Sequence, residues 1–268
     1  NTLDRKRFQP MICCLKGLGA MTRRLKADVE IFNMNLSEGR SLTRPLVLAK
    51  FFRKRRPDIV HTHSWNGGLV DGVLGSRLSN VPVVINGEHG YFGRRLYQRL
   101  IQRAMAAICD STLSVSEELK REFSLTVGVP LSRIKVISNG VDTQTFSGRH
   151  DTAELREEIY DRFKFKISAG DFIIGNIGSL KPVKNQKMLL SAVRQIKTAG
   201  ALNTVKVVMV GEGPDRAMLE RFISDYSLKE EILLLGQRDD IPRLLSLLNV
   251  LVLCSVKNWE GLSNVILE

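Results

Sequence analysis

Short apolar runs rich in β-branched residues alternate along this chain with amphipathic stretches of helical period. Strand–helix–strand units of this kind pair as parallel sheets covered by helices, so the alternation predicts a fold of the α/β class. The expected strands are residues 10–15, 29–34, 58–62, 81–86, 112–115, 135–138, 172–178, 205–210, 232–235 and 250–254. The expected helices are residues 45–55, 68–79, 94–107, 117–124, 186–198, 215–226 and 241–248.

The alternation occurs in two series, and a charged stretch poor in apolar side chains, residues 148–166, lies between them. We therefore expect two doubly wound Rossmann-like domains that face each other across a cleft. The expected bounds are 1–148 for the N-terminal domain, 149–169 for a charged interdomain segment and 170–268 for the C-terminal domain. The chain starts at Asn1 and stops at Glu268 within an apolar helical pattern, so we expect an internal segment of a longer protein.

Basic residues concentrate in the first half of the chain. Residues 1–147 hold 23 Lys and Arg against 12 Asp and Glu, whereas the remainder holds 17 against 16. This excess predicts that the first half meets an anionic membrane surface, a nucleic acid or an acidic acceptor. The cysteines show no C-x-x-C spacing and lie in apolar runs, which indicates buried thiols in a reducing cytosol rather than disulfides or a zinc site.

The C-terminal segment, residues 255–268, follows an apolar strand and opens a helix, whose first N–H groups can receive an anion. Glu260 and Glu268 lie within it at an E-x7-E spacing. Carboxylates in a dry site accept hydrogen bonds from sugar or ribose hydroxyls. Taken alone, two glutamates at this spacing are more often ordinary surface carboxylates.

Two further turns follow apolar strands of the second half. The turn at 178–185 carries Lys181 and Lys184, and a lysine there can neutralise a diphosphate on a leaving nucleotide. Solvated surface lysines are the alternative. Gly211 and Gly213 would let the backbone approach a nucleotide closely, although a plain tight turn would also use them. Arg216 stands where a dinucleotide fingerprint needs its third glycine, which disfavours binding of NAD.

In the first half, His61 and His63 lie two residues apart at a strand end, so their side chains point the same way. Together with His89 they raise the question of a metal. No cysteine or carboxylate cluster completes a ligand set and no D-x-D motif occurs, so the sequence predicts no metal site. Asn139, before Gly140, is most simply part of a turn.

Residues 94–107 alternate arginines with apolar residues such as Leu96 and Leu100. This amphipathic pattern suits an anionic leaflet, so we expect a membrane-facing set of Arg94, Arg95, Arg99 and Arg103. A plain solvated face is the main alternative. A nucleic-acid partner is disfavoured, because few aromatics are interleaved for base stacking and no nucleic-acid motif appears.

Motifs spread over nearly the whole chain resemble, in the same order, segments of the retaining glycosyltransferases of family 4, also called group 1, which have the GT-B fold. The matching segments are PDIVHTH (57–63), EHG (88–90), VSEEL (115–119), NGVD (139–142), GSLKPVK (178–184), VGEGP (210–214), LGQRDDI (235–241) and SVKNWEGLSNVILE (255–268). The resemblance also implies that an opening strand with a glycine-rich loop and the closing helices lie outside the chain.

The resemblance implies an enzyme that moves a hexosyl unit from a nucleotide-diphosphate sugar to an acceptor hydroxyl, with retention and without a metal or other cofactor. Surface polysaccharide, lipopolysaccharide or glycolipid synthesis is the expected setting. The N-terminal domain would hold a glycan or lipid-linked acceptor, and the C-terminal domain would hold the nucleotide sugar. A cytoplasmic protein, peripheral at the inner face of the membrane, is expected.

Residue roles follow from the same resemblance. It implies three catalytic residues, His89, Lys184 and Glu260. It implies an acceptor or cleft set of His63, Glu88 and Asn139. The implied donor-binding residues are Gly178, Ser179, Lys184, Gly211, Gly213, Gln237, Arg238, Glu260, Gly261, Leu262 and Glu268. The chain departs from the family at Ser179, where arginine is common. A non-catalytic module that binds sugar nucleotides or anionic lipid, and a GT-B sugar-nucleotide epimerase, are the alternative functions.

Overall fold

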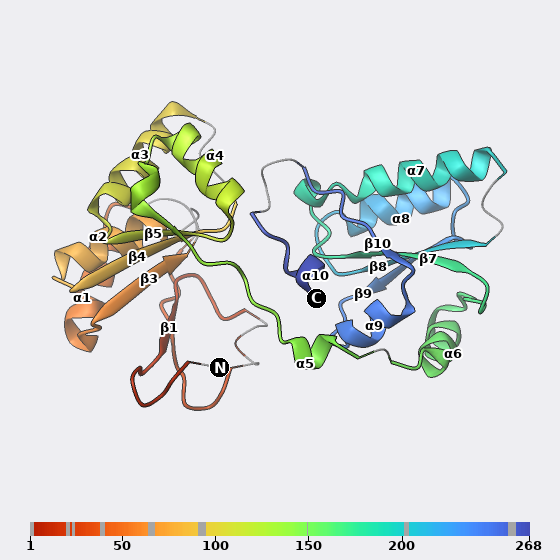
Figure 1. Ribbon diagram of the computed structural model, residues 1–268, viewed down its shortest axis with the longest axis horizontal. Coiled ribbons are helices and arrows are strands. Elements are labelled where there is room, and N and C mark those ends of the chain that lie inside the picture. Colours follow the sequence, from red (N-terminus) through yellow and green to blue (C-terminus); the bar gives the residue numbers. More distant parts are fainter. Residues whose placement is uncertain are drawn as a thin grey trace. The chain divides into compact units, whose positions relative to one another are not determined.

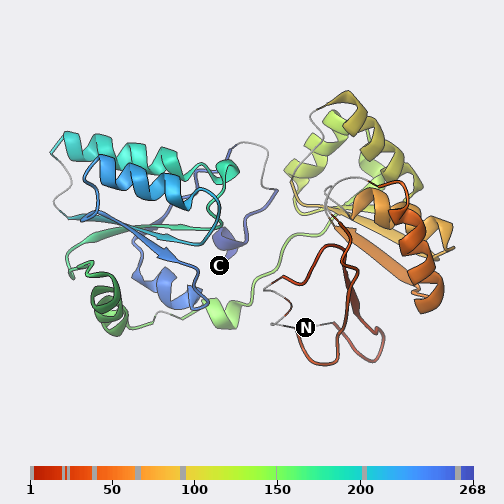
Figure 2. The same cartoon turned by 180° about the vertical axis from the view of Figure 1, so that it is seen from behind.

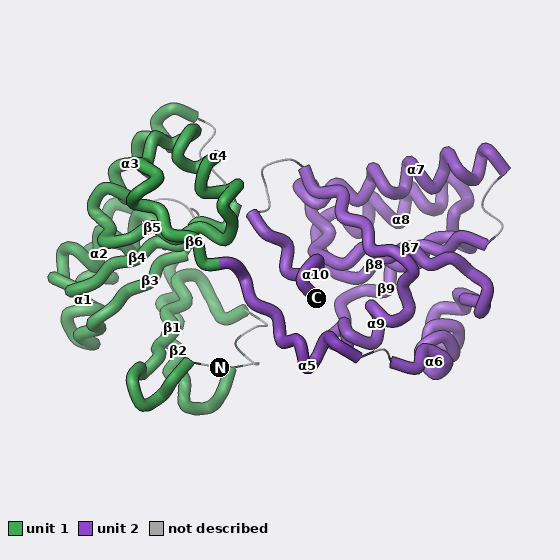
Figure 3. The backbone as a smooth tube through the Cα atoms, viewed as in Figure 1, with its two compact units in different colours: residues 1–137 green, residues 138–268 purple. Residues whose placement is uncertain are grey.

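The computed structural model describes residues 3–19, 22, 25–37, 41–63, 68–90, 95–148, 150–200, 204–256 and 261–268. The chain divides into two compact units, residues 1–137 and 138–268 (Figure 3). Every strand pair of the described residues is parallel, and helices follow the strands in both units (Figure 1). This arrangement confirms the predicted α/β class.

The main sheet of the first unit has the strand order β3-β4-β5-β6. Its strands are β3 (Ile59–His63), β4 (Val83–Glu88), β5 (Ser111–Ser114) and β6 (Ile134–Val136). The connecting helices are α2 (Leu69–Leu78), α3 (Leu96–Ile108) and α4 (Glu117–Val127), with the 3-10 turn η2 (Leu131–Arg133) before β6. A separate two-stranded sheet pairs β1 (Met11–Cys14) with β2 (Glu30–Asn33), and α1 (Arg44–Arg55) precedes β3.

Local sequence explains how α4 begins and ends. The hydroxyl of Ser116 accepts a hydrogen bond from the backbone N–H of Leu119 at 3.1 Å, which caps the first turn. Gly128 follows the last turn with φ +80°, a left-handed conformation that glycine adopts without the strain a Cβ would bring. A separate apolar core packs α1 and α2 against the sheet and includes Leu48, Val73 and Val84, each fully buried.

The sheet of the second unit has the order β10-β7-β8-β9. Its strands are β7 (Phe172–Ile177), β8 (Val205–Val210), β9 (Ile232–Gly236) and β10 (Val250–Leu251). The helices are α5 (Thr143–Phe146), α6 (Ala153–Phe163), α7 (Gln186–Thr198), α8 (Arg216–Asp225), α9 (Ile241–Leu247) and α10 (Asn264–Leu267), with the 3-10 turn η3 (Pro182–Lys184) before α7. Because the last strand pairs with the first, the winding reverses beside β7, and such reversals are where parallel sheets bind ligands.

Helices cover both faces of this second sheet. Val207 and Met209 of β8 pack with α7 and α8, whereas the alternate residue Val208 packs with α6 and α9. Figures 1 and 2 show the same division, with α7 and α8 on one side of the sheet and α6 and α9 on the other. The second unit is therefore a doubly wound, Rossmann-like domain, as predicted.

The charged stretch that separates the two series of strands is structured. Its helix α6 places Leu155 and Ile159, four residues apart, fully inside the core, and Phe165 and Ile167 are buried after it. This segment is part of the second compact unit. Placement of the functional domain boundary at residue 148 stays a prediction.

Gly211, among the described glycines, combines a very close backbone contact with a positive φ, so it cannot accept a side chain without strain. A Cβ there would lie 2.0 Å from the carbonyl oxygen of Gly178, and φ is +141°. We expect Gly211→Ala to lower the free energy of unfolding by roughly 3 kcal/mol through overlap and strain. Gly170→Ala is the matched control, because nothing lies within 4 Å of its added Cβ. Equal urea midpoints for the two variants would contradict this packing.

Candidate functional site

Three loops meet at the C-terminal edge of the second sheet. The backbone N–H of Gly178 donates to the carbonyl of Val210 at 2.9 Å, and that of Gly211 donates to the carbonyl of Gly236 at 2.8 Å. These bonds continue the sheet past the strand ends and bring the glycines of neighbouring loops together. The structure thus places the predicted donor residues Gly178 and Gly211 side by side.

The loop after β7 is held from two sides. Its Ser179 carbonyl accepts a hydrogen bond at 3.0 Å from Nε2 of Gln186, a buried side chain at the start of α7. The Leu180 carbonyl lies under Gly213, where an added Cβ would approach the oxygen to 2.2 Å. Ser179 and Gly213, both predicted for donor binding, are therefore fixed within one small area.

Lys184 reaches back from η3 over this area. Its Cε lies 3.9 Å from the position that a Cβ would take on Gly178. Loss of solvent around the half-buried ammonium, and then the charge of Lys181, lower the pKa of Lys184. A cation disfavoured by its surroundings gains from an added anion, so the Lys184 side chain can help to hold a phosphate group beside the glycine loops.

The C-terminal segment lies partly against the same loops. The backbone N–H of Val256 donates to the carbonyl of Val183 at 2.8 Å. Asn139 donates from Nδ2 to the carbonyl of Leu262 at 3.2 Å and to Oδ1 of Asn264 at 2.8 Å. The predicted cleft residue Asn139 is therefore joined to the segment that carries Gly261, Leu262 and Glu268. Glu260 lies outside the described residues.

In the loop after β9, carboxylates of the same unit engage the Arg238 side chain, so a ligand would meet the backbone groups of this loop more readily than the Arg238 guanidinium. The Arg238 guanidinium donates to both carboxylate oxygens of Asp240, at 2.8 and 2.7 Å, and to Glu158 of α6. Arg243 donates to the other oxygen of Glu158 at 3.1 Å. Asp240 and Glu158 raise the pKa of Arg238, so this side chain stays charged and engaged. Gln237 and Arg238 stay predicted base contacts, through their backbone groups.

In the first unit, three imidazoles gather above Gly87. Nδ1 of His63 lies 2.9 Å from Nε2 of His89, within hydrogen-bond distance, and the rings of His61 and His63 are 4.1 Å apart. Loss of solvent and then the neighbours His61 and His89 lower the pKa of His63 to about 4, so its ring is neutral at pH 7. Within the described residues, no group of three or more His, Cys, Asp or Glu side chains is arranged to hold a metal ion.

Glu88 is turned into the first unit. Its side chain is 4% exposed, and its Oε1 accepts a hydrogen bond from Nδ2 of Asn86 at 2.8 Å. Thr62 in turn donates to Oδ1 of Asn86 at 2.9 Å, which completes a buried polar chain between β3 and β4. Burial raises the pKa of Glu88 to about 7. A direct contact of Glu88 with an acceptor stays a prediction.

The expected membrane-facing helix α3 carries apolar side chains outward. Leu96 is 71% exposed and Leu100 is 55% exposed, one helical turn apart. Arg95 and Arg103 are exposed and Arg99 is half-buried, whereas Arg94 lies outside the described residues. The outward side chains of Leu96 and Leu100 and the exposed Arg95 and Arg103 lie on one helix, and a membrane-facing role for the arginines stays a prediction.

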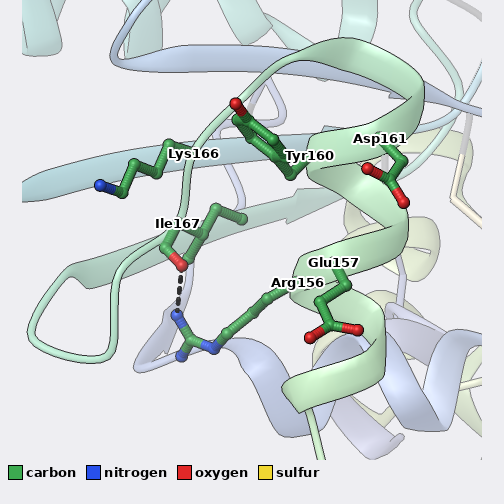
Figure 4. Close-up of a pocket in the computed structure, with 6 residues that line it drawn as sticks. All are labelled: Arg156, Glu157, Tyr160, Asp161, Lys166 and Ile167. Carbon is green, nitrogen blue, oxygen red and sulfur yellow. Dashed lines mark hydrogen bonds between the residues drawn. The ribbon is translucent and has the colours of Figure 1, made fainter.

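A hollow of about 320 Å³ lies on the outer side of α6 (Figure 4). In it, Arg156 donates from Nη1 to the carbonyl of Ile167 at 3.3 Å. Its lining residues are Arg156, Glu157, Tyr160, Asp161, Lys166 and Ile167. None of the predicted site residues lines this hollow, so it marks no part of the candidate site.

Residues 1–145 match the family described as Glycosyltransferase Family 4, and residues 157–268 match Glycosyl transferases group 1. This chain belongs to the family 4 glycosyltransferases. The resemblance found in the sequence is thereby confirmed, and with it the assignment to a glycosyltransferase enzyme of the GT-B fold class.

Relatives and solved structures agree with this membership. The glycosyltransferase is 30% identical, over 99% of its own length and 70% of the relative's, to UDP-Gal:alpha-D-GlcNAc-diphosphoundecaprenol alpha-1,3-galactosyltransferase of Escherichia coli. It is 24% identical to N-acetyl-alpha-D-glucosaminyl L-malate synthase of Bacillus anthracis, over 82% of the chain and 56% of that relative. Its fold matches that of Anabaena HepE, solved with UDP and glucose, with a TM-score of 0.74, 22% identity and coverage of 96% of this chain and 69% of HepE.

Because the carboxyl group of Glu88 is buried, we expect the stability of this glycosyltransferase to depend on pH. An unfolded Glu88 ionises near pH 4.5 but the folded one only near 7, so unfolding releases a proton between these values and stability falls as pH rises. The wild type should lose free energy of unfolding between pH 5 and pH 8. We expect this loss to be smaller by roughly 2 to 3 kcal/mol in Glu88→Gln. Urea unfolding of Glu88→Gln and of the exposed control Glu118→Gln checks this. A wild-type pH slope in Glu88→Gln would show that the carboxyl ionises normally.

Proposed function

We propose that this chain belongs to a retaining, metal-independent glycosyltransferase that moves a hexosyl unit from a nucleoside diphosphate sugar to an acceptor hydroxyl. The observation that carries the proposal is the meeting of the loops at Gly178, Gly211 and Gly236 with Lys184 above them. Such an edge presents backbone groups and one ammonium group to a ligand, which suits a nucleotide diphosphate better than an apolar molecule.

The diphosphate would lie beside Lys184. Helix α7 begins at Gln186, two residues further on, so the positive end of its dipole adds to the ammonium charge. Negative charge grows on the diphosphate as the sugar leaves, and a positive group already in place stabilises that state more than the bound donor. Glu260 and Glu268 would bind sugar and ribose hydroxyls, as the family resemblance implies.

Retention would follow from attack on the same face as the leaving group. The acceptor oxygen bonds to the anomeric carbon as the bond from that carbon to the phosphate oxygen breaks, and the departing phosphate takes the acceptor proton. In this reaction the protein contributes positioning and charge stabilisation. The resemblance assigns His89 of the first unit to the donor sugar.

The relatives suggest the class of donor and acceptor. The Escherichia coli relative is named for UDP-Gal and a diphosphoundecaprenol-linked sugar, and HepE was solved with UDP. We therefore propose a uridine diphosphate sugar as donor and a lipid-linked glycan as acceptor, in surface polysaccharide or glycolipid synthesis. The chain spans 70% and 56% of the two relatives described, so these substrates belong to the proposal.

A lipid-linked acceptor requires access to a membrane surface. Among the described residues, none of the helices is long and apolar enough to span a bilayer. The outward Leu96 and Leu100 of α3, with Arg95 beside them, support docking of this helix on an anionic leaflet instead. The basic excess of residues 1–147 adds a favourable electrostatic contribution.

Removal of the Lys184 ammonium tests the donor site. We expect Lys184→Ala to lower turnover on the order of 10²-fold, because one group aimed at the leaving diphosphate is lost. Lys187→Ala is the matched control, since Lys187 is exposed on α7. The measurement is release of UDP from UDP-sugars by the full-length protein, with and without acceptor. A near-normal rate in Lys184→Ala would remove this lysine from the site, and donor binding without turnover in the wild type would support a non-catalytic module.

Neutralisation of the arginines of α3 tests membrane docking. Replacement of Arg95, Arg99 and Arg103 by glutamine should weaken binding to phosphatidylglycerol-containing vesicles on the order of a hundredfold. The control variant replaces Lys187, Arg221 and Lys229 of the second unit by glutamine, which removes the same number of positive charges. Vesicle sedimentation measures the bound fraction. Equal sedimentation of both triple variants would contradict docking through α3.

A further inference from the structure

Two of the imidazoles of the first unit, those of His63 and His89, form a hydrogen-bonded pair beside Gly87. In the sheet, His63 of β3 is the register partner of Gly87 of β4. A Cβ at Gly87 would lie 3.0 Å from Nε2 of His61, 3.3 Å from Nε2 of His89 and 3.4 Å from Nδ1 of His63. The missing side chain therefore leaves the space in which His89 folds back over the strand and reaches His63.

The pair leaves His89 one ring nitrogen for any other partner. Nε2 of His89 lies 2.9 Å from Nδ1 of His63, so one of these nitrogens donates and the other accepts. His63 is neutral at pH 7 because loss of solvent and the neighbouring imidazoles lower its pKa to about 4. With the proton of each neutral ring on Nε2, the tautomer that a free imidazole side chain favours, Nδ1 of His63 would be the acceptor and Nε2–H of His89 the donor.

We propose that His63 is a positioning residue that accepts a hydrogen bond from Nε2–H of His89, and thereby fixes the tautomer and ring orientation of His89. In a neutral His89 ring, Nδ1 is then the acceptor, and it can take a hydrogen bond from a hydroxyl group of the donor sugar. The inference rests on the proposed function for its effect on turnover, but the hydrogen bond itself can be tested without substrate.

His61 provides a matched comparison. Its ring is tilted against that of His63 at 4.1 Å, so its removal disturbs the same cluster, whereas the hydrogen bond to His89 comes from His63. Asparagine at position 63 offers its amide oxygen near the place of Nδ1 and can restore the acceptor. The imidazole signals of His61, His63 and His89 can each be assigned with single variants.

The first arm of the experiment is nitrogen-15 NMR of the histidine rings in the full-length protein. We expect His89 to show the Nε2–H tautomer in the wild type, in His61→Ala and in His63→Asn, and a mixture of tautomers in His63→Ala. Assignment comes from the signal lost in His89→Gln. An Nδ1–H tautomer of His89 in the wild type would overturn the proposal, whether or not the variants fold.

The second arm measures transfer from UDP-sugars. We expect His63→Ala to lower turnover roughly tenfold or more with an unchanged KM for the acceptor, because the His89 ring is no longer held in one orientation. His63→Asn should recover most of the rate. Equal loss in the two variants would reduce His63 to a packing role and contradict the proposal. A wild type that transfers no sugar would refute the proposed function, while the NMR arm would still decide the role of His63.

Discussion

The candidate donor site depends on close approach of backbone to backbone at the end of the second sheet. The hydrogen bonds from Gly178 to Val210 and from Gly211 to Gly236 carry the ladder beyond the strands, where a side chain at Gly211 would overlap a carbonyl group. This contact fixes where the turn before α7 begins, and so it fixes the place of Lys184. A binding edge made of backbone is sensitive to added volume but tolerates changes in exposed side chains, which suits a fold that serves many donors and acceptors.

The two units differ in the kind of interaction that they offer. The basic excess is confined to the first unit, where α3 turns Leu96 and Leu100 outward. The second unit is nearly balanced in charge, and its charged side chains form short-range ion pairs. An example is Arg238, in the loop after β9, which pairs with Glu158 and Asp240. A broad positive field attracts an anionic surface over a distance, whereas a single ammonium beside glycine loops selects a small anion. This division is what the proposed membrane docking of the first unit and the proposed nucleotide binding of the second unit would require.

Much of the fold could be predicted because apolar periodicity is a local property. The strand 205–210 and the helix 186–198 have the predicted bounds, and the ordered motifs gave the family that the comparisons confirm. Helix α6 was missed because only Leu155 and Ile159 mark its buried side within a charged stretch. The pairing of Arg238 with Glu158 joins residues 80 positions apart, and no local pattern reports it. The burial of Glu88 was hidden for the same reason, since its partner chain through Asn86 and Thr62 crosses two strands.

The central claim is that a nucleoside diphosphate binds at the C-terminal edge of the second sheet. Hydrogen-exchange mass spectrometry of the full-length protein with and without UDP tests it most directly, because it maps binding without requiring transfer. The account predicts slower exchange in the loops at residues 178–184, 211–213 and 236–238 and in the C-terminal segment at 261–268. Protection confined to the hollow beside α6, or unchanged exchange at saturating UDP in all four segments, would contradict it.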